Sequence, residues 1–203
     1  MRVSGLFGGR SSPGPGPTDA SGGAWAALGA EIRSCERCDL HRNRTHAVIY
    51  RGGDRPRLVF VGEAPGAEED RQGLPFVGRS GRRLDEGIGT VGLAPSEFGI
   101  VNLLKCRPPS NVFSRAAAVE CRPYLDRQLA LLAPELVVSL GAHALAALDP
   151  AAPRITEAAG VARPNGRWTL FPLLHPAATF RSRRNLDMWA RDLARLRELV
   201  HRG

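Results

Sequence analysis

Arg57-Leu58-Val59-Phe60-Val61-Gly62-Glu63-Ala64-Pro65-Gly66 is the stretch that decides the fold. Its first half is a short apolar run of the kind that forms a buried strand. Gly and Pro then break the run into a turn that carries Glu63 and, a little further on, Glu68, Glu69 and Asp70. Ligands of open α/β sheets bind beyond the carboxyl ends of the strands, so these carboxylates form a candidate site. The alternative is a solvated loop with ordinary surface acids, and the rest of the chain has to decide between the two.

Four apolar runs alternate with amphipathic segments along the chain. Strands are expected over residues 57–62, 98–104, 135–140 and 168–174. Helices are expected over residues 24–34, 80–91, 115–132, 141–148 and 185–200. Pro123 lies inside the third of these helices and predicts a kink or a later helix start. Strands that alternate with helices favour an α/β fold, in which helices cover both faces of a parallel sheet.

The ends of the predicted strands carry small or polar residues. Glu63, Asn102, Gly141 and His175 each fall at or just past the end of one strand. Because the carboxyl ends of parallel strands meet at one edge of a sheet, we expect these four positions to lie close together. This convergence favours the site interpretation of the acidic turn.

The composition is that of one globular domain with a basic surface. The chain has 203 residues, of which 43% are hydrophobic, and this is enough for a sizeable core. Its formal net charge is +8, and Lys105 is its only lysine, so almost all the positive charge is arginine. An excess of positive charge is typical of proteins that bind nucleic acid, and the planar guanidinium suits phosphate. A GC-rich genome accounts for the choice of Arg over Lys but not for the excess of charge.

Local composition also predicts where the folded domain begins and where the protein works. Residues 1–23 are rich in Gly, Pro and Ser and are expected to form a disordered tail, which leaves residues 24–203 as the domain. No stretch is long and apolar enough to span a membrane, and the N-terminus lacks the apolar core of a signal peptide. We therefore expect a cytoplasmic protein with no membrane partner, and a monomer by default.

Four cysteines need an explanation other than disulfides, which are rare in the cytoplasm. Cys35 and Cys38 form a C-x2-C pair, and Cys106 and Cys121 follow much further along the chain. Four thiolates can hold zinc or an iron–sulfur cluster, and the spacing does not choose between them. The alternative is that the four residues are buried free cysteines. The C-x2-C pair favours a metal site over this alternative.

Five motifs in a fixed order resemble those of the family 4 uracil-DNA glycosylases. The motifs are Gly62-Glu63-Ala64-Pro65-Gly66, Glu69-Asp70, Gly73-Leu74-Pro75-Phe76-Val77-Gly78, Asn102 through Lys105-Cys106-Arg107-Pro108-Pro109, and His175-Pro176-Ala177. The cysteine spacing is also similar to that of the family. Any one motif would be weak, but all five in order are specific, and together they span about Cys35 to Leu199.

The resemblance implies a fold, a cofactor and an activity. The fold is a three-layer α/β/α sandwich around a central four-stranded parallel sheet, with residues 24–203 as the glycosylase domain. The activity is hydrolysis of the N-glycosidic bond of deoxyuridine in DNA, which leaves an abasic site and initiates base excision repair. Uracil-containing DNA is the implied partner. The implied cofactor is a [4Fe-4S] cluster bound by Cys35, Cys38, Cys106 and Cys121.

Two residues suit the recognition of a base on their own terms. The target base has to leave the stack and enter a pocket, where Phe76 would be the stacking platform. The amide of Asn102 offers a donor and an acceptor, which suit O4 and N3–H of uracil. The alternatives are a core Phe in a turn bounded by glycines and an Asn that caps a turn.

Two ionisable residues are candidates for catalysis. His175 would donate a hydrogen bond to uracil O2, where negative charge builds as the bond breaks, and a structural histidine is the alternative. Glu63 would orient water or stabilise the cationic sugar, and the sequence does not choose between these roles.

Backbone N–H groups of the turn at Gly62 and Ala64 would hold the base. Glu69 resembles a family position near uracil C5, where a side chain would exclude the methyl group of thymine.

The segment after His175 is the candidate DNA contact. It contains Arg181, Arg183 and Arg184 beside Phe180. In the family this loop enters the minor groove. Arginines there can contact phosphate, and an apolar side chain can wedge between bases. An ordinary basic loop before the last helix is the alternative.

One loop departs from the family pattern, and two other functions stay open. After Arg-Pro-Pro the family usually has a small residue and Asn-Arg-x-Pro, whereas this chain has Ser110-Asn111-Val112-Phe113-Ser114.

The other functions are a glycosylase that also accepts hypoxanthine or xanthine, and an iron–sulfur DNA-binding module without catalysis. The complete set of Glu63, Asn102 and His175 argues against the module, which would not require all three.

Overall fold

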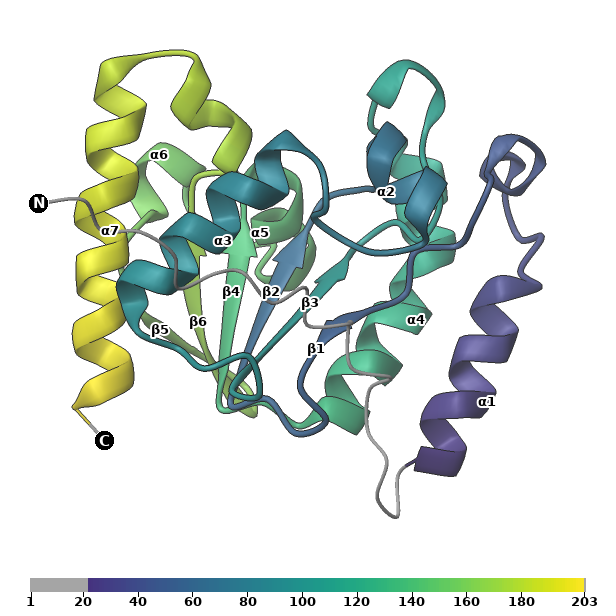
Figure 1. Ribbon diagram of the computed structural model, residues 1–203, viewed down its shortest axis with the longest axis horizontal. Coiled ribbons are helices and arrows are strands. Elements are labelled where there is room, and N and C mark those ends of the chain that lie inside the picture. The colour runs from purple at the N-terminus through teal and green to yellow at the C-terminus, as the bar shows by residue number, and fades with distance from the viewer. Residues whose placement is uncertain (1–21, 203) are drawn as a thin grey trace, which may run out of the picture.

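A computed structural model describes residues 22–202, and its centre is a twisted six-stranded sheet. The strand order is β1-β3-β2-β4-β6-β5. Four central strands are parallel, with bounds Leu58–Gly62 (β2), Phe98–Asn102 (β3), Leu136–Leu140 (β4) and Trp168–Leu173 (β6). Their arrowheads point the same way in Figure 1. The predicted parallel sheet is therefore confirmed, with each strand within a few residues of its expected range.

Two short edge strands extend the sheet beyond the four that were expected. They are β1 (Arg51–Gly52), which pairs with β3, and β5 (Arg163–Asn165), which pairs with β6. Both run antiparallel to their neighbours. Each is too short to produce an alternating apolar pattern, so the sequence carries no periodic signal for either.

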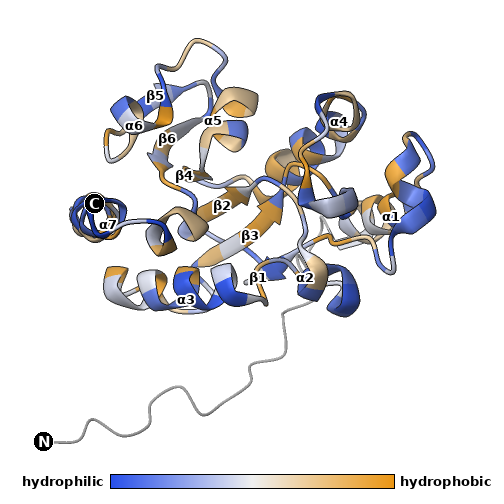
Figure 2. Ribbon diagram, turned by 90° about the horizontal axis from the view of Figure 1, so that it is seen from above, coloured by the Kyte–Doolittle hydropathy of each residue, from blue (hydrophilic) through white to orange (hydrophobic). Residues whose placement is uncertain are grey.

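Helices cover both faces of the sheet and complete the predicted three layers (Figure 2). On one face lie α3 (Arg79–Val91) and α7 (Arg183–His201), and on the other α4 (Arg115–Leu132) and α5 (Ala142–Leu148). The helix α1 (Gly22–Arg33) packs on the outside of α4. The shorter helices are α2 (Ala67–Gln72), α6 (Ile155–Ala158), η1 (Asp39–Asn43), η2 (Pro109–Asn111) and η3 (Pro176–Phe180).

The strands are apolar along their whole length because both faces are buried. Alternate residues of β2 point to opposite sides, so Phe60 packs in the cluster of α3 and α7 while Val59 and Val61 pack in the cluster of α4 and α5. Leu84 and Trp189 fill the first cluster, and residues such as Leu125, Leu129 and Leu145 fill the second. These two cores fix the sheet on which the site is built.

The structure bears on two expectations, one on α4 and one on the N-terminal segment. Pro123 lies inside α4, yet the helix starts at Arg115, where the Ser114 hydroxyl caps it by accepting from Ala117 N–H at 3.2 Å, and continues to Leu132. The suggestion of a later helix start is therefore wrong. The tail expected over residues 1–23 lies outside the described residues except for Gly22 and Gly23, which open α1. In residues 22–202 there is no helix with the length and apolar character needed to cross a membrane.

Candidate active site

The carboxyl ends of the central strands meet at one edge of the sheet. β2 and β3 end in register at Gly62 and Asn102, and β4 and β6 run in register to the same edge. Backbone hydrogen bonds continue past the strands, since Gly141 N–H donates to Leu173 O at 2.8 Å. Glu63 and His175 follow directly, so the predicted convergence of the four strand ends is confirmed.

Asn102 presents an amide that has no partner among residues 22–202. The side chain is 1% exposed, and neither Oδ1 nor Nδ2 makes a hydrogen bond within the described chain. Its backbone is held in place, because the Lys105 ammonium donates to the Asn102 carbonyl and, at 2.6 Å, to Gln128 Oε1. Leaving a buried polar group unpaired costs about 1–3 kcal/mol, so a fixed and unpaired amide points to a ligand that supplies both an acceptor and a donor.

The ring of Phe76 lies beside this amide. A Cβ at Gly62 would overlap both the Phe76 ring and Asn102 Oδ1, so glycine is the residue that lets the two side chains approach the strand end. Phe76 itself has a φ of +56°, a strained conformation for a residue other than glycine. A Cβ at Gly81 would overlap the Phe76 carbonyl. The ring also faces His175, with centroids 5.8 Å apart and planes inclined by 35°.

Glu69 holds the turn that carries Phe76. Its Oε1 accepts from Val77 N–H at 2.9 Å and from Gly78 N–H at 2.8 Å, and its Oε2 accepts from Gly66 N–H at 3.1 Å. The carboxylate therefore ties the first turn of α2 to the residues after Phe76. Its role in excluding the thymine methyl stays a prediction, but the hydrogen bonds give Glu69 a structural function that sequence reasoning missed.

His175 is arranged as a neutral hydrogen-bond donor. Its Nδ1 accepts from Ala177 N–H at 3.2 Å, which leaves the proton of the neutral ring on Nε2. Burial lowers the pKa of His175 below its ordinary value of 6.5, and the positive charge of Arg181 adds to this effect, while Glu63 and Glu69 oppose it. The imidazole is therefore uncharged at neutral pH and offers Nε2–H to a ligand at the strand ends.

Glu63 has a partner that the sequence did not suggest. Nδ1 of His143, in the first turn of α5, lies 2.7 Å from Glu63 Oε2. The His143 ring stacks on Phe113, with centroids 3.9 Å apart and planes inclined by 10°. The Glu63 side chain is 32% exposed, so its carboxylate is open to solvent and to a ligand. The site thus combines a neutral donor, an unpaired amide, an aromatic face and a carboxylate.

Comparison with known proteins agrees with this geometry. The family model of the uracil DNA glycosylase superfamily matches residues 49–197. The chain belongs to the uracil DNA glycosylase superfamily. A type-4 uracil-DNA glycosylase of Archaeoglobus fulgidus is 36% identical over 83% of this chain and 89% of its own length, and one of Thermotoga maritima is 38% identical over 76% and 82%. A type-5 enzyme of Mycobacterium leprae is 31% identical over 61% of this chain and 70% of its own length. The family 4 resemblance of the motifs is thereby confirmed.

In this superfamily member the four cysteines form no disulfide within residues 22–202. Cys38, Cys106 and Cys121 share a small hydrophobic cluster, and the Arg44 guanidinium donates to Cys35 O at 2.8 Å and to Cys106 Sγ at 3.3 Å. Burial raises the pKa of the Cys121 thiol to about 11. Within residues 22–202 no group of His, Cys, Asp and Glu is arranged as a site for a metal ion. Four clustered thiols with an N–H donor to sulfur nevertheless have the donor chemistry of an iron–sulfur site.

The basic segment of this uracil DNA glycosylase superfamily member lies next to His175. Phe180 is 36% exposed at the end of η3, with the Arg79 guanidinium 4.0 Å and that of Arg83 5.4 Å from its ring centroid. Arg79 and Arg83 come from α3, so α3 and η3 together build this surface. The sequence analysis had expected it only in the segment after His175. Of the predicted DNA contacts, Arg183 pairs with Asp187 at 2.9 Å, and all of Arg181, Arg183 and Arg184 are exposed.

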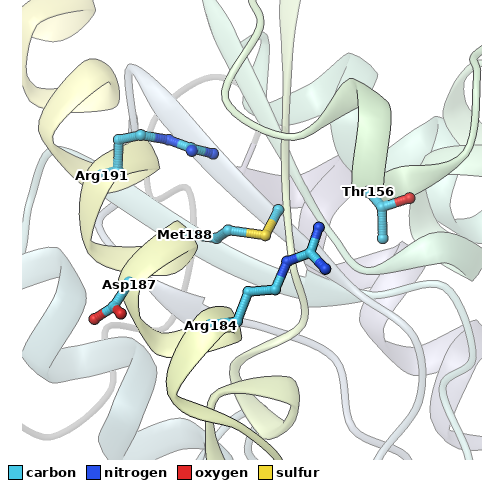
Figure 3. A pocket seen from close by; sticks show the side chains of 5 residues that line it. All are labelled: Thr156, Arg184, Asp187, Met188 and Arg191. Carbon is cyan, nitrogen blue, oxygen red and sulfur yellow. The ribbon is translucent and has the colours of Figure 1, made fainter.

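Arg184 also lines a surface pocket away from the strand ends. The pocket has a volume of about 690 Å³ and lies between α6 and α7. Figure 3 shows side chains of α7 reaching toward Thr156 on α6. None of the predicted catalytic or base-binding residues lines it. Its lining residues are Thr156, Arg184, Asp187, Met188 and Arg191.

Asp70, which the sequence left without a role, is a structural residue. It is 6% exposed, and its carboxylate accepts from Thr45 N–H at 2.9 Å and 3.1 Å. His46 Nδ1 lies 2.9 Å from the Asp70 carbonyl. These bonds fasten the segment that carries the C-x2-C pair to α2. Only the position of Asp70 within the family motif signals this role in the sequence.

Proposed function

We propose that the protein removes uracil from DNA by hydrolysing the N-glycosidic bond and leaves an abasic site. The observation that carries the proposal is the buried amide of Asn102, whose Oδ1 and Nδ2 have no partner among the described residues. Uracil supplies a complementary N3–H donor and O4 acceptor side by side. The type-4 names of the relatives and the family membership support the same activity.

The residues of the strand ends divide the work of the reaction. Phe76 stacks on the extruded base, and the Asn102 amide and the backbone N–H groups at Gly62 and Ala64 fix it. As the bond from C1′ to N1 breaks, its electron pair moves onto the uracil ring. His175 donates Nε2–H to O2, where this charge collects, and so stabilises the transition state more than the bound substrate.

Glu63 serves the sugar side of the same bond. The breaking bond leaves positive charge on the deoxyribose, and water must add to C1′. The Glu63 carboxylate, which is 32% exposed, either orients that water or stabilises the cationic sugar. In both roles the side chain has to be ionised and held in place.

We propose that Cys35, Cys38, Cys106 and Cys121 bind a [4Fe-4S] cluster. The support is the clustering of the thiols, the Arg44 donor to Cys106 Sγ and the likeness to the family's cysteine spacing. The cluster would be structural, because four protein ligands tie the N-terminal segment to β3 and α4 and leave no open position. The purified protein should be brown and contain about four irons and four sulfides per chain. A colourless protein with stoichiometric zinc would overturn the assignment.

We propose that DNA is bound across η3 and the start of α7. Arg181, Arg183 and Arg184 contact phosphates. Phe180 is exposed, and the Arg79 guanidinium lies over its ring. This ring is the apolar side chain that can wedge between bases. Replacing the three arginines by Gln should reduce the slope of log affinity against log salt by up to about three. An unchanged slope would place the phosphate contacts elsewhere.

The test of the activity is cleavage of defined oligonucleotides. A strand with one uracil should break at that position after alkali treatment, and a strand with thymine should stay intact. Strands that contain hypoxanthine or xanthine show which other bases the protein releases. Cleavage of either strand would favour the glycosylase with the broader substrate range. No cleavage of the uracil strand by a protein that binds the same DNA would favour the non-catalytic module.

A further inference from the structure

His143 lies against the carboxylate that we assign to the sugar side of the reaction. Its Nδ1 is 2.7 Å from Glu63 Oε2. Because a carboxylate only accepts hydrogen bonds, Nδ1 of His143 carries the hydrogen atom and donates a hydrogen bond to Glu63 Oε2. The two residues follow β2 and β4, which are neighbours in the sheet, so the backbone already brings them close. The contact belongs to the site edge, although no predicted function uses His143.

The imidazole of His143 is held in one plane. Phe113 stacks on it with ring centroids 3.9 Å apart and planes inclined by 10°. Phe113 lies in the loop that departs from the family pattern, after two residues with left-handed backbone, Ser110 at φ +53° and Asn111 at φ +56°. The departure therefore has a structural consequence, since this loop delivers an aromatic face to a histidine that touches Glu63.

Fixing the His143 ring matters because the Glu63 side chain is partly open to solvent. A free glutamate would exchange between rotamers, and catalysis depends on reacting groups that are already in position. A directed hydrogen bond from a stacked ring restricts Oε2 and leaves Oε1, which has no hydrogen bond among the described residues, available to water or sugar. Groups that orient a reacting side chain in this way commonly change activity without touching the substrate.

We propose that His143 is a positioning residue that holds the Glu63 carboxylate for uracil release, with Phe113 fixing the plane of its ring. The proposal rests on the proposed role of Glu63. It assigns His143 no contact with uracil or with DNA. The stacked histidine therefore acts on the rate of the chemical step and not on the affinity for the strand.

Single-turnover uracil release by three His143 variants tests the proposal. His143→Ala should lower the maximal rate about 10- to 100-fold, by analogy with the loss of hydrogen bonds that orient metal-binding side chains. The concentration that gives half the maximal rate should change little. His143→Asn places an amide N–H near the position of Nδ1 and should recover much of the rate, whereas His143→Gln, whose longer side chain misplaces this donor, should recover less. Equal melting temperatures show that all three fold.

The double variant Glu63→Gln/His143→Ala separates positioning from other effects. If His143 acts through Glu63, its removal should cost little more once the carboxylate is gone. A His143→Ala variant as fast as the wild type, a loss confined to DNA affinity, or a full additional loss in the Glu63→Gln background would each overturn the proposal. An inactive wild-type protein would instead count against the uracil-DNA glycosylase function itself.

Discussion

Phe76 and Asn102 share the space in front of one glycine. A Cβ at Gly62 would overlap the edge of the Phe76 ring and the Oδ1 atom of Asn102. The proposed stacking platform and the proposed hydrogen-bonding amide are thus brought together by the absence of a single side chain. The φ of +56° at Phe76 and the buried, unpaired amide of Asn102 are both unfavourable for folding. Their coincidence at the strand ends indicates that the region is built for a ligand.

Gly62→Ala should disable the site without unfolding the protein. The new methyl group has to displace the ring or the amide, so kcat/KM for uracil release should fall at least about 100-fold, which corresponds to about 2.7 kcal/mol. Gly23→Ala is the matched control, because no atom lies within 4 Å of its added Cβ, and it should keep the wild-type rate. Equal rates for the two variants would show that the close approach at Gly62 is unimportant.

Asn102→Leu should make the protein more stable and inactive. The leucine has a similar size and removes two buried atoms that lack partners among the described residues, so the free energy of unfolding should rise by about 1 kcal/mol. The rate of uracil release should drop at least about 100-fold, since the site loses the amide that offers the base a donor and an acceptor side by side. Thermal melting and release of labelled uracil measure the two effects.

Ser139→Ala is the control for Asn102→Leu. It also removes a buried oxygen from the middle of the sheet that has no partner in the described part of the chain, and it should leave the rate unchanged. If Asn102→Leu is instead destabilising and still active, the amide is a structural group and the assignment to uracil is wrong.

Glu69→Ala should weaken both the fold and the reaction. The carboxylate accepts hydrogen bonds from Gly66, Val77 and Gly78, and losing it leaves three backbone N–H groups without their partner. We expect a loss of about 1–3 kcal/mol in the free energy of unfolding and a slower release of uracil, because the Phe76 turn loosens. Thymine release by the same variant tests the predicted role in selectivity, which is supported only if thymine excision appears.

The sequence identified the parts of the site that follow directly from strand ends. Four apolar runs and the residues at or just past their ends were enough to group Glu63, Asn102, Gly141 and His175 at one edge. Elements with too few residues to be periodic were not foreseen, such as β1, β5 and the single-turn α6. The helix α2 was expected only as an acidic turn, because its six residues contain no buried apolar face.

Contacts between distant side chains could not be predicted at all. His143 pairs with a carboxylate 80 residues away, and it is an exposed residue of a short helix with no motif around it. The three hydrogen bonds that the Glu69 carboxylate accepts depend on the conformation of the turn that carries Phe76, and composition does not reveal them. Glu69 was a candidate only through the family resemblance, and His143, which lies two residues after Gly141, was not a candidate.

The pH dependence of uracil release should report the protonation of the half-buried His175. Burial lowers its pKa below 6.5, so the ring stays neutral as the pH falls through 6.5, and the acid limb from this group should lie below that value. Protonation places a hydrogen on Nδ1 against Ala177 N–H and breaks that bond. The unfolded chain takes up this proton first, so stability should also decrease as the pH falls from 6.5 toward the folded pKa. An acid limb above pH 6.5 would contradict this assignment.

The most direct measurement compares the His175→Ala variant with the wild type in two assays on the same uracil-containing oligonucleotide. Removing a donor that stabilises developing charge typically costs about 100- to 1,000-fold in rate. We therefore predict a single-turnover rate of uracil release lower by this factor, with a Kd for the DNA within about threefold of the wild type, because His175 acts mainly in the transition state. Equal losses in rate and affinity, or an unchanged rate, would contradict the account of a catalytic site at the strand ends.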